Sequence, residues 1–205
     1  TIETSGNTTS NDDSSFYGLN AAVLVAANSA VTVLGGSITT TGTGANGAFP
    51  TGENASISLS GTTINATGDG GHGVMATSGG LLTLEDVNIT TAGANSAPLA
   101  TDRGSGTVNV TNGTVFSSGR DSPGMYSTGV ITVNGTNVTA TGSEAAVIEG
   151  SNSITLTNIS LTGSAGTRDR GIMVYQSMSG DAEQGIGTFT MTGGSYTWTS
   201  STGPA

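Results

Sequence analysis

The sequence predicts an all-β protein, a single right-handed parallel β-helix of about seven coils with three strands in each coil. Three observations predict this fold. A short stretch of alternating apolar and polar residues recurs at intervals of roughly 23 to 26 residues over most of the chain. A glycine closes most repeats at a fixed position. A third short apolar segment lies between each closing glycine and the next repeat.

The first strand of each repeat starts with two apolar residues separated by one polar residue. In 131–134, for example, Ile131 and Val133 alternate with Thr132 and Asn134. This alternation places the apolar side chains on one face of a strand and the polar side chains on the other. The same apolar pair recurs at Val31/Val33, Ile57/Leu59, Leu82/Leu84, Val108/Val110, Ile154/Leu156 and Phe189/Met191.

The second strand follows a corner and ends at a glycine four residues after its leading apolar residue. A fixed period of this length is typical of solenoids, whose units bury their apolar faces only against their neighbours. We assign the leading position to Ile38, Ile64, Ile89, Val115, Val138 and Ile159. The closing glycines are then Gly42, Gly68, Gly93, Gly119, Gly142 and Gly163.

The third strand starts with a small residue, which larger apolar residues usually follow. Three strands in a turn of this length favour a right-handed parallel β-helix. A left-handed hexapeptide helix would need a six-residue period and a leucine-rich repeat would need a helix, and the sequence shows neither pattern. The third strands are expected at 21–25, 47–51, 73–77, 97–101, 124–128, 146–150 and 171–175.

The repeat continues from residue 1 to residue 205, so we expect one domain, part of a longer solenoid, with two interruptions. These are a polar loop at 7–19 and an insertion loop at 176–187, and long loops on a rigid scaffold often carry binding residues. Ile2, Tyr196 and Trp198 occupy second-strand positions in the first and last coils. Exposed strand edges pair with other strands, so these residues are candidates for end-to-end self-association into filaments.

The recurring V-T-V-x-G-x-x-V-T-x-x-G texture, together with segments 101–119 and 172–185, resembles the adhesin-like right-handed β-helix proteins of bacterial and archaeal surfaces. These belong to the broad pectin-lyase-like group. The resemblance covers nearly the whole chain and implies an extracellular or cell-surface location and an adhesive or structural role. The group also includes lyases and hydrolases, and a fold alone does not imply an activity.

The amino-acid composition limits the classes of partner that the protein is expected to bind. The net charge is −10 with no lysine, which disfavours binding to nucleic acid or to anionic membranes. The absence of cysteine excludes disulfides, thiolate metal sites and cysteine catalysis. No apolar run is long enough for a membrane helix, so we expect no membrane insertion by this segment. The expected partners are a surface polysaccharide, another surface protein or a second copy of the chain.

A catalytic role is the least favoured interpretation. His72, in the segment GGHGV, resembles the G-H-G motif of polygalacturonases. Glycoside hydrolysis needs two carboxylates that flank one bond, and the other motifs of that family are missing here. We therefore interpret His72 as a turn residue and expect neither a hydrolase nor a lyase, and no required cofactor.

Calcium is the metal that the sequence could hold. Acidic residues recur just after the closing glycine, at Asp69, Asp121, Glu144 and Asp169, and stacked oxygen ligands suit Ca²⁺. Within this row Asp121 and Glu144 are the candidates. Asp181 and Glu183 in the insertion loop form a second candidate pair. Solvated or ion-paired turn acids are the alternative interpretation.

The outward residues of the second strands are rich in threonine and form a candidate ligand-binding face. Such a face resembles the T-x-T surface of ice-binding proteins, and it could equally bind carbohydrate, although Asn65, Ala92 and Phe116 interrupt it. Threonine is also simply common in exposed strands. A carbohydrate-binding or ice-binding module is thus the alternative to an adhesive or structural segment. The candidate residues are Thr39, Thr41, Thr67, Thr139, Thr141 and Thr162.

Overall fold

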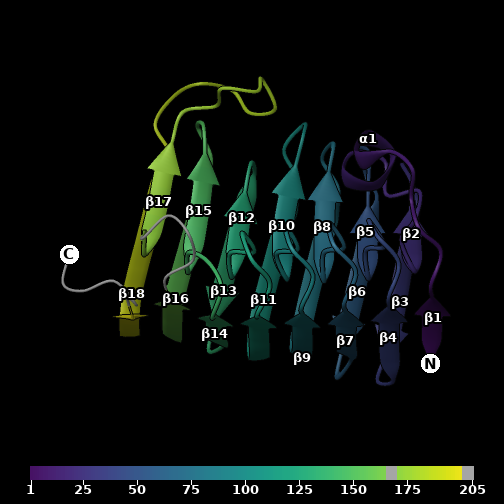
Figure 1. The fold of residues 1–205 in the computed structure, drawn as a ribbon, viewed down its shortest axis with the longest axis horizontal. Helices are drawn as coiled ribbons and strands as arrows, with labels where there is room; N and C mark the ends of the chain where they lie inside the picture. Colours follow the sequence, from purple (N-terminus) through teal and green to yellow (C-terminus); the bar gives the residue numbers. More distant parts are fainter. Residues whose placement is uncertain (165–169, 200–205) are drawn as a thin grey trace.

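A computed structural model shows the chain as a parallel β-solenoid, and it describes residues 1–164 and 170–199 (Figure 1). The coils stack along the long axis of the molecule, so that the first and last coils lie at opposite ends. The chain makes about six turns. This agrees with the sequence, in which seven predicted first strands are separated by six complete repeats. In the described part, no helix is long and apolar enough to cross a membrane.

The strands form three faces around one axis, here named A, B and C, and four long strands pass through the corner between A and B. Face A contains β3 (Ala30–Leu34), β6 (Ser56–Ser60), β13 (Val130–Asn134) and the first parts of β9 (Leu81–Thr91), β11 (Thr107–Ser117), β16 (Ser153–Ser164) and β18 (Thr188–Thr199). Face B contains β1 (Ile2–Thr4), β4 (Ser37–Thr40), β7 (Thr63–Ala66), β14 (Asn137–Ala140) and the second parts of the four long strands. Face C contains β2 (Val23–Val25), β5 (Ala48–Pro50), β8 (Val74–Thr77), β10 (Leu99–Asp102), β12 (Met125–Ser127), β15 (Ala146–Glu149) and β17 (Ile172–Tyr175).

The predicted core register is confirmed in the middle of face A. Val133 pairs with Val110 in the preceding coil and with Leu156 in the following one. All three side chains point into the solenoid, and each is no more than 2% exposed. Thr132, one residue away, lies on the outer surface and is partly exposed. The alternation in the sequence therefore fixes which side chains form the apolar column.

The closing glycines stack directly on one another between faces B and C. A Cβ atom on Gly68, Gly93 or Gly119 would lie well within 3.0 Å of the carbonyl oxygen of the glycine one coil before it. Any other residue would therefore force adjacent coils apart. Close approach of backbone to backbone, and not a special dihedral angle, explains why glycine recurs at these positions.

The alignment of the sixth repeat is wrong by two residues. Leu161, not Ile159, pairs with Val138, and Gly163 pairs with Ala140. Ile159 instead fills the buried corner of its coil and is 1% exposed. The spacing from the apolar pair of the first strand is the better guide, because Leu161 follows Leu156 at the same distance as Val138 follows Val133.

The polar loop predicted at 7–19 contains a short helix, α1 (Asn11–Ser15), which lies over face C. The Ser10 Oγ caps this helix by accepting a hydrogen bond from the Asp13 backbone N–H at 3.2 Å. The buried Ser14 hydroxyl donates to the Gly44 carbonyl at 2.9 Å. The loop is thus docked on the solenoid by specific hydrogen bonds.

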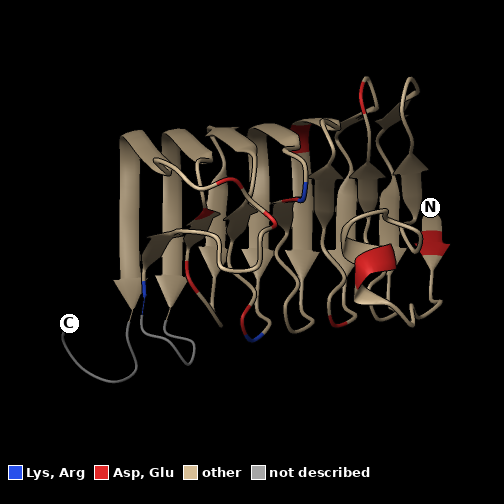
Figure 2. Ribbon diagram, turned by 90° about the horizontal axis from the view of Figure 1, so that it is seen from above, with Lys and Arg blue, Asp and Glu red and all other residues tan. Residues whose placement is uncertain are grey.

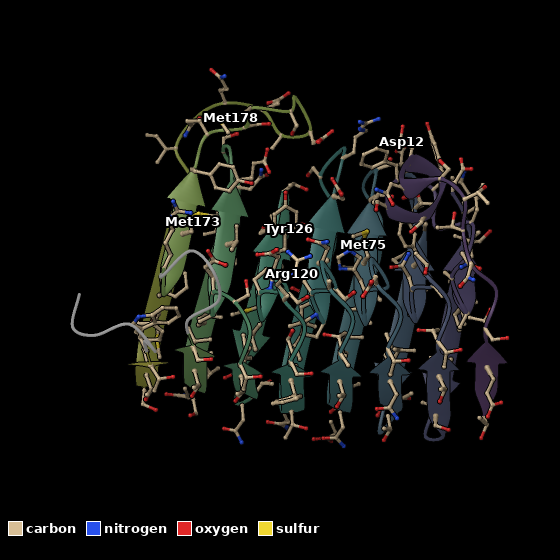
Figure 3. All side chains as sticks on the ribbon, in the orientation of Figure 1. Asp12, Met75, Arg120, Tyr126, Met173 and Met178 are labelled. Atoms are coloured by element: carbon tan, nitrogen blue, oxygen red, sulfur yellow. The ribbon has the colours of Figure 1, made fainter. Side chains whose placement is uncertain are left out.

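Face C differs from the other faces because its outward residues are largely apolar. Phe49, Met75, Ala97 and Ala100 form a second buried cluster, against which Ala21, between the polar loop and β2, packs. At the other end of face C the insertion loop folds back along the solenoid, where Asp181 pairs with Arg103 at 2.8 Å. Figure 3 shows Met178 on this loop, where its side chain is 93% exposed. The Arg103 guanidinium also lies over the Phe16 ring of the polar loop, so the two loops meet at this residue, just beyond the end of β10.

Candidate functional site

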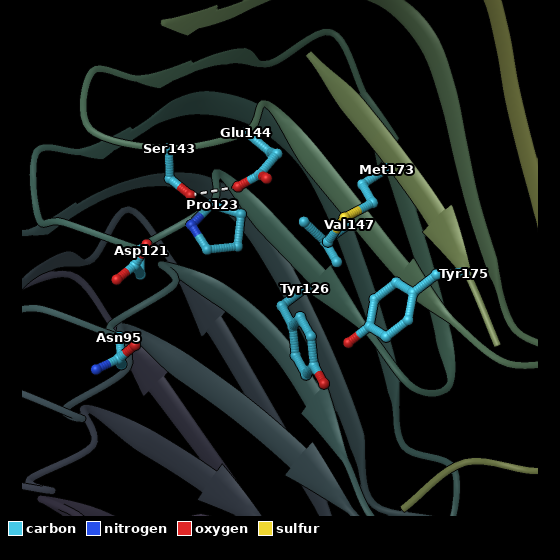
Figure 4. Close-up of a pocket in the computed structure, with 9 residues that line it drawn as sticks. All are labelled: Asn95, Asp121, Pro123, Tyr126, Ser143, Glu144, Val147, Met173 and Tyr175. Atoms are coloured by element: carbon cyan, nitrogen blue, oxygen red, sulfur yellow. Dashed lines mark hydrogen bonds between the residues drawn. The ribbon is translucent and has the colours of Figure 1, made fainter. Parts of the chain in front are cut away.

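The candidate site is a groove on the outer surface of face C. It consists of two adjoining cavities of about 200 and about 190 Å³, which share Asn95, Asp121, Pro123 and Tyr126. We name their combined surface the face C groove. The first cavity is also lined by Ser143, Glu144, Val147, Met173 and Tyr175 (Figure 4). The second cavity is also lined by His72 and Ala97. The groove thus extends over the coils from β8 to β17.

Small residues at one position of the stacked coils create the hollow. Backbone hydrogen bonds from Gly73 N to Ala97 O and from Gly124 N to Glu144 O, with the pairing of β10 and β12, set the register here. In this register His72, Ala97, Pro123 and Glu144 lie one above another in successive coils. Ala97 and Pro123 are smaller than their neighbours in the column, so they form a depression between His72 and Glu144.

The two tyrosines of the groove are held by a buried carboxylate. The hydroxyls of Tyr126 and Tyr175 donate to the same oxygen of Glu149, Oε2, at 2.6 and 2.7 Å. Glu149 is 3% exposed, and Ser179 also donates to its Oε1 at 3.3 Å. Burial acts to raise the pKa of Glu149, but the hydroxyl donors outweigh it and lower that pKa. Because both tyrosine hydroxyls are held by hydrogen bonds, the rings of Tyr126 and Tyr175 form rigid surfaces in the groove.

His72 lies between the turn at Asp69 and Gly70 and the start of β8, and it lines the groove. Burial lowers its pKa to about 4, so its ring is neutral at pH 7. Its Nδ1 lies 3.1 Å from the carbonyl oxygen of Ala97. In the neutral ring Nδ1 donates to this oxygen, which leaves Nε2 as a hydrogen-bond acceptor. This second role of His72 could not be predicted from the sequence, because it depends on the small residues of later coils.

Two of the predicted calcium residues, Asp121 and Glu144, meet in the groove. Arg120 donates to Asp121 and forms an ion pair with it. Glu144 is 8% exposed, and its Oε2 accepts a hydrogen bond from the Ser143 hydroxyl at 2.6 Å (Figure 4). Its Oε1 is buried and has no hydrogen-bond partner among the described residues.

The other two calcium candidates lie in the insertion loop. Asp181 is bound by Arg103, which lowers its pKa, and Glu183 is exposed. Both line a separate cavity of about 370 Å³ beneath the loop. Within residues 1–164 and 170–199, no three His, Asp or Glu side chains are close enough to hold a metal ion. Asp169 lies outside the described residues. Calcium binding stays a prediction.

The predicted threonine face is the outer surface of face B. Thr39, Thr139 and Thr162 lie in one row, together with Asn65, Thr90 and Phe116. Thr41, Thr67 and Thr141 lie in the next row, where the Thr67 and Thr141 hydroxyls contact carbonyls of the preceding coil at 3.4 and 3.3 Å. Thr39 and Thr41 also line a cavity of about 330 Å³ beside β1.

A more regular row of outward-facing polar side chains, which we did not predict, lies on face A. The same alternation that identified the core also predicts this outward row, since the two alternate along each first strand. The row contains Thr32, Ser58, Thr83, Asn109, Thr132, Thr155 and Thr190.

The candidate self-association residues lie in the outermost coils. Ile2 is 37% exposed and pairs with Ile38, and Tyr196 is 39% exposed and pairs with Leu161. Trp198 is partly buried and pairs with Gly163. Acidic residues occur along the solenoid, including β1 and α1, whereas basic residues are few (Figure 2).

Comparison of the chain with protein-family models, with curated proteins and with solved structures found no match.

Proposed function

We propose that the chain is a non-enzymatic, adhesive segment of an extracellular or cell-surface protein and that it binds an extended polysaccharide in the face C groove. The observation that carries this proposal is the groove itself. It combines rigid tyrosine rings, an apolar floor and a few fixed polar groups, and it follows the stacked coils from β8 to β17. Binding sites for small molecules and polymers commonly have this mixture.

The chemistry of a sugar ring matches the groove lining. A pyranose has apolar C–H faces, which pack on aromatic and aliphatic surfaces such as Tyr126, Pro123 and Val147. Its hydroxyl groups donate hydrogen bonds, and Asp121 and Glu144 supply acceptor oxygens. The coils repeat at a strand spacing of about 4.7–4.9 Å, so an extended chain along the axis would meet similar backbone surroundings at each coil.

The state of the acidic residues favours binding over cleavage. A glycosidase needs an acid and a second carboxylate on opposite sides of one bond. In the groove, Asp121 is engaged by Arg120, and Glu144 accepts a hydrogen bond from Ser143. His72 is neutral, and its Nδ1 is bound to a carbonyl. The ion pair of Asp121 and the hydrogen bond of Glu144 support a binding role for these two carboxylates.

The resemblance to adhesin-like β-helix surface proteins supports the cellular location in this proposal, and the acidic, cysteine-free composition agrees with it. Other surface proteins are alternative partners. End-to-end association through the outermost coils, near Ile2, Tyr196 and Trp198, is an alternative use of the solenoid.

A second candidate function uses the flat outer faces. The outward rows of faces A and B carry mostly hydroxyl and amide side chains at the coil spacing. Such a regular surface could bind ice or a crystalline polysaccharide, with Thr39, Thr41, Thr67, Thr139, Thr141 and Thr162 as contact residues.

The test is affinity electrophoresis of the purified chain through gels that contain neutral, amino-sugar or uronic-acid polysaccharides. Retardation is expected in at least one of these gels. Tyr126→Ala should abolish the retardation because it removes the ring from the groove. Phe116→Ala is the matched control, since Phe116 is an aromatic residue on face B with 37% exposure. Loss of binding in the Phe116 variant but not in the Tyr126 variant would place the ligand on face B and contradict the proposal.

A further inference from the structure

One oxygen of the Glu144 carboxylate is buried but has no hydrogen-bond partner among the described residues. Glu144 is 92% buried, since 8% of its surface is exposed, and the Ser143 hydroxyl satisfies its Oε2. Its Oε1 is buried without a partner among the described residues. A buried charged oxygen without a donor is costly, so an isolated one in a groove points to a donor that a ligand supplies.

Two arginines of the described residues in this region, Arg120 and Arg170, have other partners. Arg120 is bound to Asp121. Arg170 occupies the position next to Glu144 in the following coil, as the hydrogen bond from Ala145 N to Gly171 O shows. Its guanidinium donates to the Met173 sulfur at 3.4 Å.

The other acidic groups nearby are better satisfied. Asp121 has its arginine, and Glu149 accepts hydrogen bonds from Tyr126, Tyr175 and Ser179. Among these acidic residues, Glu144 is therefore the one whose carboxylate has a buried oxygen without a hydrogen-bond donor among the described residues. Its terminal χ3 torsion is broad, so the carboxylate can turn toward a ligand with little strain.

Resting on the polysaccharide-binding function proposed above, we infer that Glu144 pairs with an ammonium group of the ligand. The groove then selects a glycan that contains unacetylated amino sugars. A protonated amine has three N–H donors and forms charge-assisted hydrogen bonds with a carboxylate. The net charge of −10 also attracts such a glycan and repels one that contains uronic acids. Val147, Met173 and Pro123 supply apolar surface beside the carboxylate for the sugar ring.

The test compares two tetrasaccharides by isothermal titration calorimetry at a pH where the amine is protonated. One is a β-1,4-linked glucosamine tetramer and the other is its fully N-acetylated counterpart. The unchanged protein should bind the amino form about 10-fold or more tightly than the acetylated form, as expected for one additional charge-assisted hydrogen bond. Glu144→Gln should bring the two affinities within about 3-fold of each other while binding of the acetylated form persists.

Glu85→Gln is the matched control for general electrostatic attraction. Glu85 is exposed on face A and pairs with Ser60, so the variant loses the same charge far from the groove. It should keep the preference for the amino form. Equal affinity of the unchanged protein for both tetramers, or equal loss of preference in the two variants, would overturn the role of Glu144 but leave polysaccharide binding intact. Binding of neither tetramer would overturn the inference about amino sugars, and the gel test above would then decide separately whether the groove binds another polysaccharide.

Discussion

Replacement of Gly119 by alanine tests the stacking of the closing glycines. In the structure, a Cβ atom at this position would lie far within 3.0 Å of the Gly93 carbonyl oxygen and 2.7 Å from the Ser122 Oγ. That hydroxyl itself donates to the Gly93 carbonyl at 2.8 Å. Backbone cannot move aside as a flexible side chain can, so the new methyl group must separate two coils or break this hydrogen bond.

The expected cost follows from these contacts. Overpacking costs about 1–3 kcal/mol, and a clash with backbone belongs at the upper end of that range. Alanine also restricts the unfolded chain, which returns about 0.4–1 kcal/mol. Gly119→Ala should therefore destabilise the protein by about 2 kcal/mol or more.

Gly61→Ala is the matched control. Gly61 has open space around it, and its φ is +59°, so alanine there meets no atoms but adopts a left-handed conformation. That conformation costs about 1–2 kcal/mol, partly offset by the same restriction of the unfolded chain. Urea denaturation followed by circular dichroism should give the lower midpoint for Gly119→Ala. An equal or higher midpoint than that of Gly61→Ala would refute the argument that close backbone contact selects the closing glycines.

Three further predictions concern register, pH and calcium. Val133→Asp should lower the melting temperature far more than Thr132→Asp, because it buries a charge, whereas the surface change should alter stability by only about 0.5 kcal/mol; the opposite order in thermal melts would show that the register is wrong. Burial raises the pKa of Asp102 from 3.8 to about 6. The folded protein therefore binds this proton more tightly than the unfolded chain does, and it loses stability as the pH rises from about 4 to about 6. Asp102→Asn should raise the urea midpoint at pH 7, and this gain should vanish near pH 4. If the acidic turns or the insertion loop bind calcium, millimolar Ca²⁺ should raise the melting temperature by mass action, and a calorimetric titration without heat would remove the idea.

The fold could be predicted because each coil repeats the same physical constraint. Apolar residues at every second position can be buried only if neighbouring coils align, so Val110, Val133 and Leu156 fall into one column. The closing glycines carry equally direct information, since backbone contact forbids a Cβ there. The error at Ile159 and Gly163 arose because Gly163 follows Ile159 by four residues, as in the other repeats. The spacing between the apolar residues of the first and second strands is more constant, and it identifies Leu161 instead.

The groove could not be predicted from the repeat, because it depends on differences between coils. Ala97 and Pro123 make a hollow only because His72 and Glu144 stand at the same position of other coils. The two tyrosines become rigid through Glu149, which lies in a different coil from both. The acids Asp121 and Glu144 were visible in the sequence, but the periodic pattern could not show that aromatic residues would line the same cavity.

The central claim, that a polysaccharide binds in the face C groove, is tested most directly by NMR mapping of the bound ligand. Titration with the oligosaccharide that binds most tightly should shift the backbone amide signals of Asn95, Asp121, Tyr126 and Glu144, which line the groove. The amide of Thr139 on face B should stay unchanged. Shifts centred on Thr139 and its row, or no shifts at saturating oligosaccharide, would contradict the account.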